Sequence, residues 1–160
     1  MWFFMINCYL FSLLTFLMLC IAFAQSFLHF PVFAANHVTF MILTSIVYLF
    51  TETLIIFFFV GTGVSVRDYT AMHNLPPVYH QTSITIKRKV YPPQLLNMLF
   101  FVILFVAVGA VDTGRVPPLI YWMYFLFCLA HFLYAKKIQH QCFRENTNNI
   151  LAMSGIKPLQ

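Results

Sequence analysis

Residues 2–24, with the sequence WFFMINCYLFSLLTFLMLCIAFA, contain no charged side chain and decide the fold class. A helix needs about 20 apolar residues to cross a hydrocarbon core of roughly 30 Å, and this run is long enough. Ala22-Phe23-Ala24 also resembles the cleavage site of a signal peptide. A signal peptide carries positive charge before its apolar core, however, and none precedes this run. We therefore predict a retained membrane helix.

Three further apolar runs follow the first one. Paired prolines precede the third and fourth runs, and proline is well tolerated at the first position of a helix. Gly61-Thr62-Gly63 closes the second run, and Asp112 to Arg115 form a tight loop after the third. The sequence predicts an all-α membrane protein with four transmembrane helices, at about residues 2–24, 38–66, 94–111 and 118–136.

The polar segments divide the chain into a membrane part and a tail. Residues 67–93 contain two proline pairs and a basic cluster, so we expect a loop there. Residues 138–160 are polar, and their first part is expected to continue the fourth helix. The predicted organisation is a four-helix transmembrane domain at residues 1–137, followed by a partly helical cytoplasmic tail at 138–160.

The composition agrees with a bilayer environment. Of the 160 residues, 61% are hydrophobic and 8% are charged, whereas a soluble domain has about 25% charged residues. Four acidic and nine basic side chains cannot cover the surface of a globule of this size. The length allows one domain. No basic patch is interleaved with polar recognition residues, so we expect no nucleic-acid partner.

The placement of lysine and arginine predicts the orientation, because short cytoplasmic loops are enriched in both. If residues 67–93 and the tail lie on the cytoplasmic side, eight of the nine basic residues lie there and Arg115 lies opposite. Both termini are then cytoplasmic. We expect a multi-pass protein of a bacterial inner membrane or an organellar inner membrane.

Glu52 is the most informative polar residue, because it lies near the middle of the second run and hence near the bilayer midplane. Ser45, Tyr48 and Glu52 recur at helical spacing and share one face, so we predict a buried intramembrane polar site. An ionised carboxylate at a helix centre costs roughly 2.5–3.5 kcal/mol or more. No basic side chain is expected at matching depth. Either a protonated carboxyl or a cation from another subunit would therefore satisfy Glu52.

The histidines and basic residues give weaker hypotheses. Four histidines on the cytoplasmic side could hold a metal or a haem, although their spacing matches no metal motif: His73, His80, His131 and His140. Five basic residues are expected to contact phospholipid headgroups or a partner protein: Lys87, Arg88, Lys89, Lys136 and Lys137. No cofactor is predicted.

The sequence contains no Ser-His-Asp set, paired carboxylates, nucleotide-binding loop or CxxC motif, so we expect no catalytic activity of its own. The leading hypothesis is a small accessory subunit of a larger membrane complex, with a respiratory or other energy-converting complex as one candidate, and with other membrane protein subunits and phospholipids as partners. The first alternative is a proton- or ion-conducting oligomer that uses Glu52. The second is a metal- or haem-binding membrane redox protein.

Overall fold

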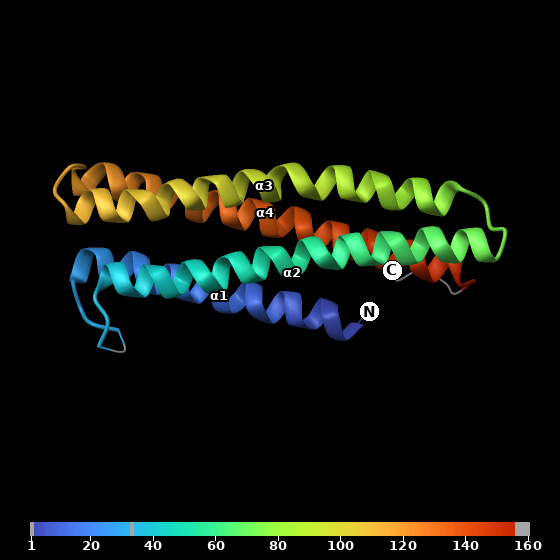
Figure 1. Ribbon diagram of the computed structural model, residues 1–160, viewed down its shortest axis with the longest axis horizontal. Coiled ribbons are helices and arrows are strands. Elements are labelled where there is room, and N and C mark those ends of the chain that lie inside the picture. Colours follow the sequence, from blue (N-terminus) through green and yellow to red (C-terminus); the bar gives the residue numbers. More distant parts are fainter. Residues whose placement is uncertain (1, 33, 156–160) are drawn as a thin grey trace.

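The computed structural model describes residues 2–32 and 34–155, and these form an antiparallel bundle of four helices (Figure 1). Each helix is long and apolar enough to cross a membrane. The bundle is therefore an all-α, four-span membrane fold, as the sequence predicts. The helices are α1 (Trp2–Leu28), α2 (His37–Met72), α3 (Val78–Asp112) and α4 (Pro118–Met153).

The two ends of the bundle differ in their connections. We call the end with residues 29–36 and 113–117 the loop end, and the end with the 73–77 turn the hairpin end. α1 begins and α4 finishes toward the hairpin end (Figure 1), so both termini point to the same side. Each helix packs against the next along the chain, and α4 also contacts α1. α2 and α4 therefore face each other across the bundle.

Local sequence explains the helix starts and stops at the loop end. Asn36 caps α2, because its side-chain oxygen accepts a hydrogen bond from the backbone N–H of Thr39 at 2.9 Å. α3 ends at the tight turn after Asp112, where Gly114 adopts a positive φ of 69° that suits glycine. Pro118 opens α4, as predicted. These signals are local and could be recognised in the sequence.

The expected loop at residues 67–93 is wrong, because most of this segment is helical. α2 continues through Gly61-Thr62-Gly63 to Met72, and α3 begins at Val78. The glycines therefore do not close α2. Gly63 is buried, and the amine of Lys87 and the hydroxyl of Ser83 lie where its side chain would be. The glycine leaves room on α2 for the end of the Lys87 side chain from α3.

The first part of α3 is an amphipathic helix in place of the expected loop. Ser83, Ile86 and Val90 are buried and lie three or four residues apart, so they share one face. Pro92 and Pro93 lie inside α3 and do not open it. Each proline removes a helical hydrogen bond and usually breaks or kinks a helix, which is why the sequence suggests a boundary there. Packing of the buried face keeps the helix continuous.

α4 also runs past the predicted boundary between residues 137 and 138 without a break. Three of its later polar residues are buried against the other helices: Gln139, Asn146 and Thr147. Beyond Lys137 the helix is therefore packed into the bundle, at least as far as the structure describes it.

Amide hydrogen exchange tests the helical hairpin directly. We expect the amides of residues 82–91 to exchange at least about 100-fold more slowly than in an unstructured peptide, because packed helices open rarely. The amide of Asn74 serves as the internal control and should exchange fast, because Asn74 lies in the turn between the two helices. Equally fast exchange at Asn74 and in residues 82–91 would show that residues 67–93 form a loop after all.

Candidate functional site

A buried ion pair joins α2 and α4 across the centre of the bundle. The side chain of Glu52 is 0% exposed, and that of Lys136 is 16% exposed. Lys136 Nζ donates to Glu52 Oε1 at 2.8 Å, and Gln139 Nε2 donates to Glu52 Oε2 at 3.1 Å. Lys136 Nζ also lies 4.8 Å from the centre of the Phe132 ring. Both carboxylate oxygens are thus hydrogen-bonded.

The expectation that Glu52 has no internal basic partner is therefore wrong. The sequence places Lys136 at the headgroups because it lies at the end of the fourth apolar run, but its side chain turns inward. A long aliphatic stem allows a lysine amine to lie well away from its own Cα. Thr15 and Tyr124, which could also have bonded Glu52, bond elsewhere: Thr15 lies 2.8 Å from the Thr51 hydroxyl, and Tyr124 donates to the Phe100 carbonyl.

Glu52 lies level with the hairpin-end limits of the apolar runs on α3 and α4. Gln94 Nε2 donates to the backbone carbonyl of Glu52 at 2.8 Å. Gln94 is the first residue of the apolar run on α3, and Lys136 follows the last residue of the run on α4. The ion pair is therefore level with the polar ends of these two runs and not with their centres. A charged pair at that depth is close to water and headgroups, and this lowers its desolvation cost.

A hydrogen-bonded chain extends from the interior to the α3–α4 surface. Asn97 Nδ2 donates to the Tyr48 hydroxyl at 2.7 Å, and His131 Nδ1 lies 3.2 Å from Asn97 Oδ1. The Asn97 amide thus links the buried Tyr48 hydroxyl to the His131 ring. Ser45, expected in the same polar stripe, is buried and donates to the Met41 carbonyl one turn earlier. Tyr48 and Glu52 thus belong to one layer, and Ser45 lies beside it.

Apolar side chains enclose this polar layer on both sides. Toward the loop end, Phe101, Leu104 and Phe125 are buried, and the rings of Tyr48 and Phe101 stack at 3.8 Å. Toward the hairpin end, a second buried cluster contains Phe59 and Phe143. A void of about 10 Å³ lies between Tyr48, Asn97 and their apolar neighbours. It has room for about one water molecule and none for a substrate.

The chain was also compared with known proteins. No protein-family model, curated protein or solved structure matches it.

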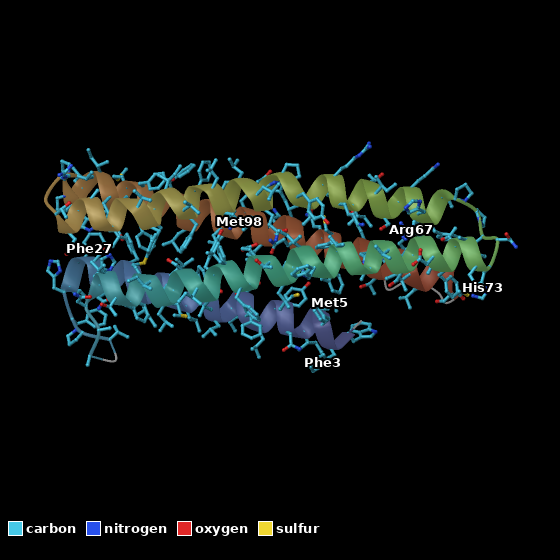
Figure 2. All side chains as sticks on the ribbon, in the orientation of Figure 1. Phe3, Met5, Phe27, Arg67, His73 and Met98 are labelled. Carbon is cyan, nitrogen blue, oxygen red and sulfur yellow. The ribbon has the colours of Figure 1, made fainter. Side chains whose placement is uncertain are left out.

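The four histidines of the metal hypothesis lie at separate places. His131 bonds Asn97, and His140 bonds the Tyr9 hydroxyl at 2.8 Å. His73 packs on Tyr69 near the hairpin turn (Figure 2), and His80 lines a shallow pocket with Arg67. Within residues 2–32 and 34–155, no three His, Cys, Asp or Glu side chains are placed to hold a metal ion. The geometry gives the metal or haem hypothesis no support.

The basic residues of the hairpin end have different environments. Arg88 and Lys137 are exposed, whereas Lys87 is half-buried over Gly63. Lys89 forms an exposed ion pair with Glu145. Lys136 forms the buried ion pair with Glu52. Headgroup contact at Arg88 and Lys137 stays a prediction.

The sequence interpretation missed Gln94, Asn97 and Gln139. Gln94 and Asn97 are three residues apart, as are Lys136 and Gln139, and residues at this spacing share a helix face. These pairs are a usable signal, but they lie at the ends of apolar runs, where polar residues also mark the membrane boundary.

Proposed function

We propose that this chain is a small, non-catalytic membrane subunit that binds another membrane protein through α1 and α2 near the hairpin end. Support comes from a mismatch between the two halves of the bundle. On α3 and α4 the apolar runs end level with Glu52. On α1 and α2 large apolar side chains stay exposed beyond that level: Trp2, Phe3, Phe4, Ile6, Phe57, Val60 and Val64.

The length of this apolar surface exceeds what a bilayer covers. The apolar run of α2, residues 38–66, has 29 residues, which is about 44 Å at 1.5 Å per residue, against roughly 30 Å of hydrocarbon. Phe57 is 64% exposed and Val60 is 41% exposed. Exposed apolar surface outside the hydrocarbon is typical of a protein interface. This is the single observation that carries the proposal.

A groove in the same surface fits a helix of a partner. Its volume is about 430 Å³, and α1, α2 and α4 line it with residues such as Phe4, Phe57, Gly61, Ser65 and Met153. Gly61 and Ser65 are both exposed and lie four residues apart on α2. Small residues at this spacing let two membrane helices approach closely. We therefore infer that the groove accepts a helix of another membrane protein, at a level where that helix extends beyond the hydrocarbon.

The alternative of ion conduction through Glu52 has less support. The Lys136 amine compensates the carboxylate charge, and Gln139 occupies its second oxygen. Phe101, Leu104 and Phe125 separate the polar layer from the loop end. An ion or proton crossing this bundle would have to pass through packed apolar side chains. Because both carboxylate oxygens of Glu52 accept hydrogen bonds from side chains of this chain, the geometry also argues against a catalytic role for Glu52.

Native gel electrophoresis in a mild detergent tests the proposal with a matched pair of variants. We expect the wild-type protein to migrate well above its mass of 18.7 kDa. Gly61→Leu should release it as a small species, because the larger side chain fills the groove. The fold should tolerate the change, since an added Cβ meets nothing within 4 Å.

Gly109→Leu is the control. Gly109 is also exposed and open, but it lies on α3 toward the loop end. This variant should keep the wild-type migration, and mass spectrometry of the band identifies the bound chain. A band that contains only copies of this chain would replace the proposed partner by a homo-oligomer. A lone 18.7 kDa species for the wild type would contradict the proposal.

A further inference from the structure

A cavity of about 680 Å³ opens at the loop end, remote from the Glu52 layer and from the groove. All four helix ends and the 29–36 loop contribute to its lining, with Gln25, His37, Asp112, Tyr121 and Trp122 as its principal side chains. Its volume lies within the range of small-molecule sites. The proposed subunit role uses none of these residues.

Gln25 leaves a buried acceptor at this cavity. Its side chain is 1% exposed, and its Nε2 donates to the carbonyls of Phe30 and Ala35, both at 3.0 Å. These two bonds fix the orientation of the amide, because only the NH₂ group can donate. Gln25 Oε1 has no partner within the described residues. An unpaired buried carbonyl is unfavourable, so a ligand with an N–H or O–H donor would be stabilised there.

His37 presents a second unpaired atom. Its Nε2 lies 2.8 Å from the Tyr121 hydroxyl, and its buried Nδ1 has no partner in the part of the chain that the structure describes. Two residues that line this cavity, one from α1 and one from α2, thus each carry an unpaired buried polar atom within the described residues. Packing defects would more often leave apolar voids.

The charge and the aromatic side chains define the class of ligand. Among the described residues that line the cavity, Asp112 alone carries a formal charge with the histidines neutral. Trp122 stacks on Phe27 with ring centres 4.1 Å apart, and Tyr121 is held by His37. Aromatic faces attract cations. We propose that this cavity binds a primary ammonium group, with Asp112 as its counter-ion and Gln25 Oε1 as acceptor of an N–H hydrogen bond.

Such an ammonium group could come from two sources. The cavity lies at the end of the membrane-spanning bundle, where the ethanolamine headgroup of a phospholipid would reach it. A free amine from the aqueous side offers the same chemistry. Choline distinguishes binding by an N–H hydrogen bond from binding by charge alone, because its quaternary nitrogen keeps the charge and has no proton to donate to Gln25.

Binding measurements on the purified full-length protein test the site. Native mass spectrometry should show phosphatidylethanolamine retained at least about 10-fold more tightly than phosphatidylcholine, because the choline headgroup leaves Gln25 Oε1 unpaired. Free ethanolamine should compete with the lipid. Asp112→Asn should weaken binding about 10-fold, whereas Asp68→Asn, an equal charge change at an exposed residue near the hairpin end, should leave it within 2-fold.

The results of these measurements distinguish a phospholipid headgroup from a free amine, and they can contradict the proposed site. Preference for phosphatidylethanolamine with competition by ethanolamine identifies the lipid headgroup. Saturable ethanolamine binding without any lipid preference, but still sensitive to Asp112→Asn, identifies a free amine. Equal binding of the ethanolamine and choline compounds, or unchanged binding in Asp112→Asn with its helical circular dichroism intact, overturns the proposal.

Discussion

The Lys136→Met variant is expected to lose about 3–5 kcal/mol of unfolding free energy, because it leaves Glu52 as an unpaired charge at a fully buried position. The methionine keeps the length of the stem and removes the ammonium group, with its charge and its hydrogen bond to Glu52. Unfolding by a denaturing detergent, followed by circular dichroism, measures the loss.

A double mutant distinguishes the loss of stability on removing one charge of the pair from the loss on removing both charges. Glu52→Leu combined with Lys136→Met removes both charges and should recover most of the stability, because apolar replacements of a buried pair are often neutral. The matched control is Lys89→Met, which breaks the exposed pair with Glu145 and should cost about 0–1 kcal/mol. If Lys136→Met cost no more than Lys89→Met, the ion pair would not stabilise this bundle.

The number and the positions of the helices could be predicted because apolar runs follow directly from the sequence. The lengths of the helices could not. Apolarity marks where a helix contacts lipid, whereas residues 78–93 and 138–153 are helical with one buried and one water-exposed face. In α3 that pattern is short and ends at Pro92 and Pro93, which favour a boundary in a single sequence. Packing against α2 and α4 keeps α3 helical through the two prolines. These packing partners cannot be recognised in the sequence.

The Glu52 site could also be predicted only in part from the sequence. Glu52 could be recognised as buried because an acidic side chain within a long apolar run would otherwise face lipid, which is costly. Its partner could not, because Lys136 is distant in the chain and its direction depends on how α4 is rotated relative to α2. The hypothesis of a missing cation therefore does not hold, and the case for a partner protein now rests on exposed apolar surface. That surface is independent of the charge on Glu52.

Phe125→Ala is expected to destabilise the bundle by about 3 kcal/mol, the lower end of the range for this substitution in protein cores. Phe125 is fully buried on α4, with ring centres 5.2 Å from Phe23 and 5.7 Å from Tyr121. In a bilayer the exposed reference is as apolar as the core, so the loss comes mainly from the cavity and its missing dispersion contacts. The same detergent unfolding measures it.

The neighbouring Leu126→Ala is the control, because Leu126 is 48% exposed on the outer face of the same helix turn and should change stability by about 0.5 kcal/mol or less. Equal losses in the two variants would mean that Phe125 does not pack in a core. The comparison also bears on conduction. Phe125 belongs to the buried apolar layer between the polar network and the loop end, so truncating it thins this layer. Proton flux in Phe125→Ala but not in the wild type would show that this layer, and not the ion pair, seals the bundle.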